Sequence, residues 1–307
     1  MIASLITVMS ISAAPTSGLQ FTGASASYIN CGQNSAYAPA QFTVEAWAYY
    51  ESTSGGYLIS NEGWDGTNGA QGFSVRTSGT KIELATGSNG TWPSLTSTTN
   101  IALNTWIHIA ITYSGTEIKM YVNGVLDATG SVATPMVASN QSLCIGEGSM
   151  WKDRRFTGKM SDLRLWNVVR TQAQIAASMS SSLVGTETGL VANWKMNEGT
   201  GNTITDATGN HTVTKPDAVT WFNINTAVKN TIADNVKVSV SDKTLKINNL
   251  SDSKIIISVY SISGQKVLEN SIKQGNSFEE NLNAPSGVYI LKCVSKDGSV
   301  GTTKFKL

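Results

Sequence analysis

Three tryptophans stand in polar loops, where an indole can meet a ligand. Trp64, Trp92 and Trp151 lie among Gly, Ser, Thr, Asn and Asp residues, outside the apolar strand patterns. Sugar rings present apolar CH faces that stack on exposed indoles, while their hydroxyls bond the acidic, amide and guanidinium groups nearby. We predict a ligand-binding surface where at least two of these indoles meet, with three polar neighbours, Asp65, Arg154 and Arg155. The alternative is that each indole only plugs the edge of the fold.

Residues suited to bond cleavage are scarce. A retaining glycosidase on a β-sandwich needs paired carboxylates on one strand, as in Glu-x-Asp-x-Glu, and the chain contains no Glu-x-Asp. Gly-x-Ser-x-Gly is absent, and His108 and His211 are the only histidines, so neither a zinc motif nor a triad is indicated. His108 lies within a strand pattern, where we expect a satisfied core histidine. We therefore predict no catalytic residues; the alternative is a hydrolase whose Glu and Asp converge from separate loops.

Composition excludes several classes of partner and scaffold. The 307 residues carry 22 basic and 21 acidic side chains, so nothing global draws the chain to nucleic acid or to an anionic membrane. Charged residues make up 14% and there are 28 glycines, which is typical of a turn-rich β protein. Three cysteines are too few for a disulfide scaffold. Cys31 and Cys144 can pair or remain two buried thiols, and Cys293 lies in the tail.

One hairpin, residues 105–127, indicates how the chain folds. Its first strand places Ile107, Ile109 and Ile111 on one face and Trp106, His108 and Ala110 on the other, the pattern of a strand covered on both sides. Asn123-Gly124 supplies the two positive-φ positions that a tight hairpin turn needs, so a third strand is predicted from Val125. A dozen short strands at about ten-residue spacing, the first over residues 19–29, predict an all-β, antiparallel two-sheet sandwich. Residues 61–72 are expected to form a loop, and Trp106, within a strand pattern, is expected in the core. A single helix is predicted from Thr171, where Thr171 and Gln174 fit a capping box.

Four segments carry a resemblance to a family. They are Phe42-Thr-Val-Glu-Ala-Trp, the stretch from Trp106 to Tyr121-Val-Asn-Gly, Phe156-Thr-Gly-Lys-Met-Ser-Asp-Leu-Arg-Leu-Trp-Asn, and Trp194-Lys-Met-Asn-Glu-Gly. Together they resemble the laminin-G-like, concanavalin-A-like jelly rolls over residues 18–222. The resemblance implies that fold and a general role in binding glycans or proteins at surfaces.

The same resemblance implies a structural calcium ion. Asp162 and Asp206 stand at acidic positions that recur in the family's motifs, and such jelly rolls often hold calcium through carboxylate and main-chain oxygens. The alternative is that Asp162 accepts hydrogen bonds from a neighbouring loop and that Asp206 starts an Asx turn. No dense acidic loop of the EF-hand type is present.

The two ends of the chain point to export. Residues 1–17 read as an export-signal remnant without a basic start, and no other segment is apolar enough to span a bilayer. Residues 223–232 read as a linker, and 233–307 as a smaller β-sandwich domain. Val259-Tyr-Ser-Ile-Ser-Gly-Gln-Lys-Val and Leu282-Asn-Ala-Pro-Ser-Gly-Val-Tyr-Ile-Leu resemble the C-terminal sorting domain of type IX secretion substrates. That resemblance implies a Bacteroidetes-type bacterium, contact with the secretion machinery, and a secreted or surface-attached protein; the alternative is a fibronectin-like spacer module.

Taken together, these features predict a secreted cell-surface protein that binds a glycan or an extracellular host or matrix protein. The two other hypotheses are a glycan-active hydrolase with its carboxylates on loops, and a surface spacer without a ligand. The spacer hypothesis predicts that Trp64, Trp92 and Trp151 are scattered or buried.

Overall fold

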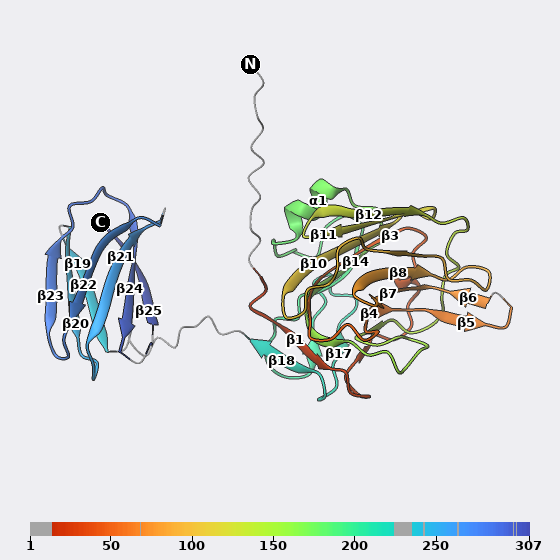
Figure 1. The fold of residues 1–307 in the computed structure, drawn as a ribbon, viewed down its shortest axis with the longest axis horizontal. Coiled ribbons are helices and arrows are strands. Elements are labelled where there is room, and N and C mark those ends of the chain that lie inside the picture. Colours follow the sequence, from red (N-terminus) through yellow and green to blue (C-terminus); the bar gives the residue numbers. More distant parts are fainter. Residues whose placement is uncertain are drawn as a thin grey trace, which may run out of the picture. The chain divides into compact units, whose positions relative to one another are not determined.

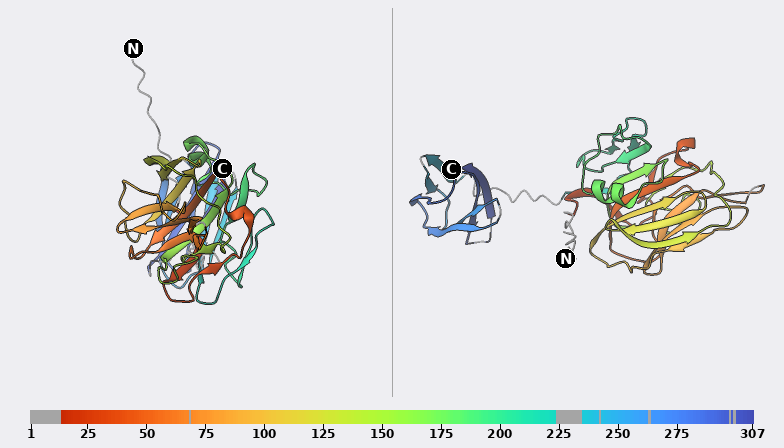
Figure 2. Two further views of the ribbon diagram at one scale, coloured as in Figure 1. Left: turned by 90° about the vertical axis from the view of Figure 1, so that its right-hand side faces the viewer. Right: turned by 90° about the horizontal axis from the view of Figure 1, so that it is seen from above.

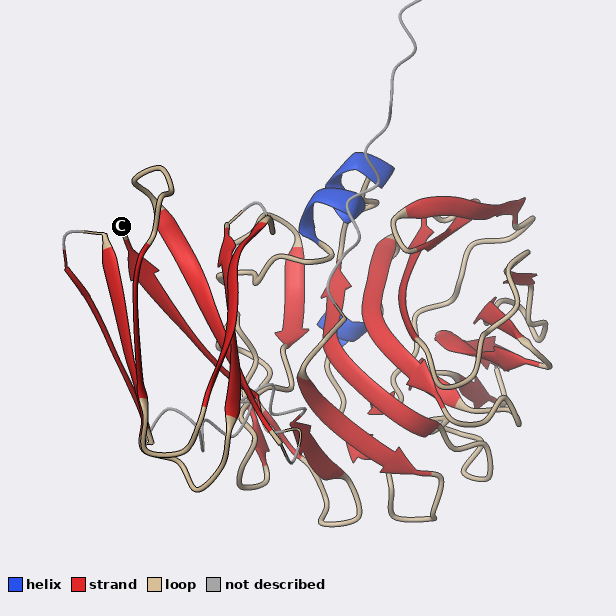
Figure 3. Cartoon of the chain, turned by 60° about the vertical axis from the view of Figure 1, so that its left-hand side comes forward, coloured by secondary structure: helices blue, strands red, loops and turns tan. Residues whose placement is uncertain are grey.

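The computed structural model describes residues 14–67, 69–223, 235–241, 243–262, 264–296, 298 and 300–307. The chain divides into two compact units, Met1–Ile224 and Asn225–Leu307. Figure 3 shows that strands dominate both units. Residues 1–13 of the predicted export signal, and all of the predicted linker except Asn223, lie outside the described residues.

The first unit is a jelly roll of two antiparallel sheets (Figures 1 and 2). The larger sheet has the order β12-β11-β10-β3-β14-β1-β18, with β15 paired to β14. Its strands are β1 (Ser17–Thr22), β3 (Phe42–Tyr50), β10 (Trp106–Tyr113), β11 (Glu117–Val122), β12 (Val125–Ser131), β14 (Thr157–Trp166), β15 (Leu190–Trp194) and β18 (Thr220–Asn223).

The second sheet has six strands in the order β2-β13-β4-β7-β8-β9. These are β2 (Ile29–Asn30), β4 (Tyr57–Ser60), β7 (Phe73–Ser78), β8 (Lys81–Thr86), β9 (Ser94–Thr96) and β13 (Cys144–Ile145). The core lies between the sheets, with Ile109 and Ile111 from the larger sheet and Ile59 and Leu84 from the smaller. Full burial of each such side chain contributes about 1.5–3 kcal/mol to stability. Burial between the two sheets therefore stabilises the all-β sandwich that the alternating apolar pattern predicted.

The predicted hairpin is confirmed. Strands β10 and β11 pair from Ile109↔Val122 to Tyr113↔Ile118, and Asn123 and Gly124 both have positive φ, 50° and 77°. The outward face of β10 is covered by a helix: Ala110 packs with Tyr121 and with Ile175 of α1 (Gln172–Ser178). The predicted capping box is also present at Thr171 and Gln174. The strand is therefore covered on both sides, by the second sheet and by α1.

Some local predictions were wrong. Trp106, expected in the core, lies half-buried on the outer face, with ring centroids 5.6 Å from Tyr49 and 5.5 Å from Phe222. The region 61–72, expected as a loop, contains a small hairpin of β5 (Gly63–Asp65) and β6 (Gly69–Gln71) that projects from the jelly roll (Figure 1). A strand predicted over residues 19–29 is divided between β1 and β2. The short elements η1 (Ser35–Tyr37), β16 (Thr203–Ile204) and β17 (Val213–Thr214) complete the unit.

The second unit is a smaller β-sandwich. A three-stranded sheet has the order β19-β20-β23, and a four-stranded sheet the order β22-β21-β24-β25. Its core includes Leu245 and Ile247 from one sheet and Ile257 and Leu291 from the other. The strands are β19 (Val236–Ser241), β20 (Thr244–Asn249), β21 (Ile255–Ser261), β22 (Lys266–Ile272), β23 (Ser277–Asn281), β24 (Val288–Ser295) and β25 (Val300–Lys306).

Candidate ligand-binding site

The β5–β6 hairpin presents Trp64 to solvent. Trp64 pairs with Ala70 across the hairpin, and 51% of its surface is exposed. The turn is built locally: Asp65 Oδ1 accepts the Thr67 N–H at 2.8 Å, an Asx-type contact, and Gly69 has a φ of +65°. Gln71 donates a side-chain hydrogen bond back to Asp65. The indole and the carboxylate thus lie on the same hairpin.

A hollow of about 430 Å³ lies beside this indole. It is lined by Trp64 and Asp65 from the hairpin and by Asn89 and Gly90 from the turn that follows β8. A Cβ atom at Gly69 would lie 2.7 Å from the Gly90 Cα, so a side chain at this glycine would push the turn away from the hairpin. Trp92, two residues beyond Gly90, is half-buried and is not among the residues lining this hollow.

The second exposed indole, Trp151, lies in the loop between β13 and β14. It is 44% exposed, and the Arg154 guanidinium carbon lies 5.9 Å from the centroid of one of its rings. Arg155, predicted as a third polar neighbour, turns instead toward Glu147, with Nε 2.8 Å from Oε1. The loop therefore offers one indole and one guanidinium to a ligand, while Arg155 holds the loop to the protein.

The two indole-bearing segments are joined at their bases. Ser149 Oγ donates to the Glu62 carbonyl at 2.6 Å and lies 3.1 Å from Ser60 Oγ. Glu62 is two residues before Trp64, and Ser149 is two residues before Trp151. Because successive Cα atoms are 3.8 Å apart, this contact limits the Cα separation of the two tryptophans to about 22 Å. The bases of the two segments, here called the rim, therefore lie next to each other, whereas no residue of the Trp151 loop lines the hollow beside Trp64.

Two buried carboxylates lie beneath this rim. Glu62 and Glu147 are 0% and 1% exposed, and burial raises the pKa of both carboxyls. Basic side chains oppose that effect, with Arg76 Nη1 3.6 Å from Glu62 and Lys152 Nζ 3.8 Å from Glu147. The sequence analysis did not predict that these two carboxylates are buried. In sequence, each is only an acidic residue in a Gly-containing loop shortly after a strand. Neither carboxyl reaches solvent, and both lie next to basic side chains inside the protein.

The carboxylates predicted to hold calcium are occupied by hydrogen bonds. Buried Asp206 accepts backbone N–H groups from Asn193 at 2.8 Å and His211 at 3.0 Å, among others. Asp162 accepts from Arg164 Nη2 at 2.5 Å and from Asn193 Nδ2 at 2.7 Å. Among the described residues no three or more His, Cys, Asp or Glu side chains form a metal-binding group. These contacts do not fit a calcium ion, and calcium binding stays a prediction that requires measurement.

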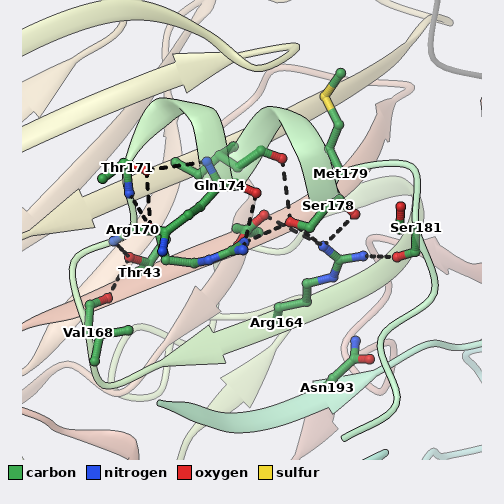
Figure 4. Close-up of polar contacts among 12 residues, drawn as sticks. Thr43, Arg164, Val168, Arg170, Thr171, Gln174, Ser178, Met179, Ser181 and Asn193 are labelled. Carbon is green, nitrogen blue, oxygen red and sulfur yellow. Dashed lines mark hydrogen bonds and ion pairs between the residues drawn. The ribbon is translucent and has the colours of Figure 1, made fainter. Parts of the chain in front are cut away.

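Helix α1 is fixed to the larger sheet by a buried ionic network (Figure 4). Glu45 is paired with Arg170 Nη1 at 2.5 Å and with Arg164 Nη1 at 3.7 Å. Arg164 in turn donates to the carbonyls of Ser178 at 3.0 Å and Ser181 at 2.8 Å. A buried charge left without its partner typically costs about 3–5 kcal/mol, so this network sets the position of α1 and of the loop that follows it.

His108 is part of the same buried layer. Its Nε2 lies 3.7 Å from Glu45, and burial, with a contribution from Arg164 and Arg170, lowers its pKa to about 3. The imidazole is therefore neutral near pH 7. The prediction of a buried histidine holds, but Nδ1 has no hydrogen-bond partner in the part of the chain that the structure describes, so the ring is not fully satisfied.

The cysteines remain thiols. Cys144 is buried in β13, Cys31 is partly buried after β2, and neither forms a disulfide. Burial raises the pKa of both thiols, and of Cys293 to about 11. None of the three is set up as a reactive thiolate at neutral pH.

The two-sheet jelly roll of the first unit is the fold of the lectin-like β-sandwich class. The laminin G-type model of the Concanavalin A-like lectin/glucanases superfamily matches residues 22–176, about half of the chain, and a Secretion system C-terminal sorting domain matches residues 222–306. The chain belongs to this superfamily. Its type IX sorting domain makes it a secreted or surface-attached protein.

The chain is also similar to individual known proteins. The chain is similar to a "putative carbohydrate binding protein" from Bacteroides ovatus, with 24% identity, coverage of 69% of this chain and 61% of that one, and a TM-score of 0.56. It also resembles a SAP-like pentraxin from Limulus polyphemus, with 16% identity, 68% and 96% coverage, and a TM-score of 0.47. Mouse pappalysin-1 is 32% identical over 81 residues, and this match covers 25% of the chain but only 5% of that relative. Among the described residues, no helix has the length and apolar character needed to cross a membrane.

Proposed function

We propose that this protein binds carbohydrate at the cell surface, through the hollow beside Trp64. The observation that carries the proposal is an indole, half exposed, on the β5–β6 hairpin beside the Asp65 carboxylate and Asn89. An apolar ring face next to acceptor and amide groups matches the two-sided chemistry of a sugar, which has apolar CH faces and polar hydroxyls. The fold shared with a carbohydrate binding protein supports this proposal.

Binding without cleavage is favoured by the placement of the acids. Glu62 and Glu147, the acids beneath the rim, are buried and paired with basic side chains. A glycosidase needs two carboxyl groups that flank the bond to be broken, within reach of the sugar. We infer that the rim retains a glycan and leaves its bonds intact. The tail, residues 233–307 by our prediction, is then the part that the secretion machinery reads.

The test uses the full chain and a panel of insoluble polysaccharides. We expect retention on at least one polysaccharide, with no release of reducing sugar. Retention should fall in Trp64→Ala and persist in Leu103→Ala, a matched control because Leu103 is 46% exposed and does not line the hollow. Release of reducing sugar would instead support the hydrolase hypothesis. Binding only to an extracellular protein would identify the ligand as a protein and not a glycan. If the chain binds neither polysaccharide nor extracellular protein, the hypothesis of a surface spacer without a ligand would be favoured.

A further inference from the structure

A second pocket, of about 190 Å³, lies on the outer face of the larger sheet at the C-terminal end of α1. It shares no residue with the hollow at Trp64. The lining residues on which the argument rests are Trp47, Ser161, Asp162, Ser182, Lys195 and Asn197. The volume is below the ~300 Å³ at which pockets for drug-sized ligands begin, so the occupant is a small molecule or one residue of a polymer.

One wall of this pocket is held by hydrogen bonds to the sheet, and another is formed by Pro15, Thr16 and Ser17, at the end of the segment predicted as an export signal. Trp47 Nε1 donates to the Met179 carbonyl at 2.8 Å. The fully buried Arg164 guanidinium binds the carbonyls of Ser178 and Ser181, as Figure 4 shows. These contacts tie the segment after α1 to the sheet at several points. A wall held this way loses little conformational freedom on binding, which favours affinity for a small ligand.

A strained residue stands at the edge of the pocket. Asp162 has a φ of +53° and lies at a β-bulge, where the register between β14 and β3 shifts between Ser161 and Arg164. Its backbone N–H donates to the Lys195 carbonyl at 3.2 Å, which brings the two lining residues together. Left-handed backbone is uncommon outside glycine, asparagine and aspartate and is concentrated at functional sites, and β-bulges re-aim side chains.

The Asp162 carboxylate, which already accepts hydrogen bonds from the protein and faces the Arg164 cation, has one acceptor position left, enough for a ligand hydroxyl. It accepts three hydrogen bonds, two from Arg164 and one from Asn193, whereas an ionised carboxylate offers about four acceptor positions. Lys195 and Asn197 line the same pocket, and their side chains carry donors that a ligand hydroxyl can accept from. One acid and one base leave the lining without net charge, so the chemistry favours a neutral ligand rich in hydroxyl groups.

We propose that this pocket is a second binding site, specific for a single neutral sugar residue, either free or at the end of a glycan chain. Its hydroxyls bond Asp162, Lys195 and Asn197, and its ring lies against the narrow exposed part of Trp47. The site is independent of the hollow at Trp64. It lies on a different element and can bind whether or not the hollow does.

The test follows the Trp47 indole N–H in nitrogen-labelled full chain, with its signal assigned from Trp47→Phe. The probes are D-glucose, D-galactose, D-mannose and N-acetyl-D-glucosamine, each with its methyl glycoside, and N-acetylneuraminic acid as an anionic sugar. We expect a saturable shift with at least one neutral sugar and none with the anionic one. A methyl glycoside that binds as well as the free sugar identifies a chain end as the ligand; loss of binding on methylation identifies the free sugar.

Variants separate this site from the hollow. Ser182→Phe, which fills the pocket, should abolish the shift, and Lys195→Met should weaken the apparent affinity at least fivefold. Trp64→Ala should leave the shift unchanged, and Lys119→Met is the matched lysine control, since Lys119 pairs with Glu117 away from the pocket. Retained polysaccharide binding at the hollow shows that Ser182→Phe is folded. The proposal is overturned if no neutral sugar moves the Trp47 signal, if only the anionic sugar does, or if the shift survives in folded Ser182→Phe.

Discussion

Replacing Trp64 by alanine tests how much of the binding free energy comes from one indole. Trp64 is 51% exposed. A tryptophan side chain presents on the order of 200 Å², so roughly 100 Å² is open to a stacked sugar. At about 25 cal/mol per Å², covering that area contributes about 2.5 kcal/mol, which is about 60-fold in Kd. If the sugar covers half of that area, the same calculation gives a change in Kd of about eightfold. We therefore expect Trp64→Ala to weaken binding by roughly 8- to 60-fold.

The assay is isothermal titration calorimetry on the full chain, with an oligosaccharide from the polysaccharide that the chain retains. Trp64→Phe should fall between wild type and alanine, because a smaller aromatic ring keeps part of the stacking surface. Leu103→Ala should match wild type. A change in Kd below about threefold in Trp64→Ala, with full binding retained, would refute the assignment of the hollow as the main site.

Three further predictions concern the buried network and calcium. The His108 pKa is about 3 in the folded chain and about 6.5 unfolded, so the unfolded state binds more protons as the pH falls. In urea unfolding, wild type should therefore lose about 2 kcal/mol of stability between about pH 8 and pH 5 through His108, and His108→Gln should not show this loss. An unchanged pH dependence in the variant would contradict a neutral buried ring. Arg164→Met should lower the unfolding free energy by about 3–5 kcal/mol and speed hydrogen exchange in residues 178–182, and unchanged exchange there would refute its anchoring role. Chelator should leave the melting temperature unchanged, because Asp162 and Asp206 are occupied by hydrogen bonds; a fall restored by calcium would show a calcium site.

The features predictable from sequence were those set by local chemistry. Alternation around Ile109 fixed which face of β10 enters the core, Asn123-Gly124 fixed the turn, and Thr171 fixed the start of α1. Trp64 was predicted to be exposed because its neighbours are turn-forming residues. Those residues form the turn of the β5–β6 hairpin, which presents Trp64 to solvent.

The features that sequence could not predict depend on contacts between distant residues. Glu45, Arg164 and Arg170 meet only after three segments fold together, and no spacing between positions 45 and 164 signals the contact. Alternation alone also could not say which layer covers the outward face of β10, so Trp106 was misplaced. Arg155 was predicted to face a ligand because its buried partner, Glu147, looks like an ordinary loop acid in sequence.

The most direct test of the account is a crystal structure of the full chain with the oligosaccharide that it retains. The account predicts an intact sugar whose ring stacks on Trp64 and whose hydroxyls contact Asp65 and Asn89. A cleaved product beside an exposed pair of carboxyls, or a sugar bound elsewhere with the hollow at Trp64 empty, would contradict it.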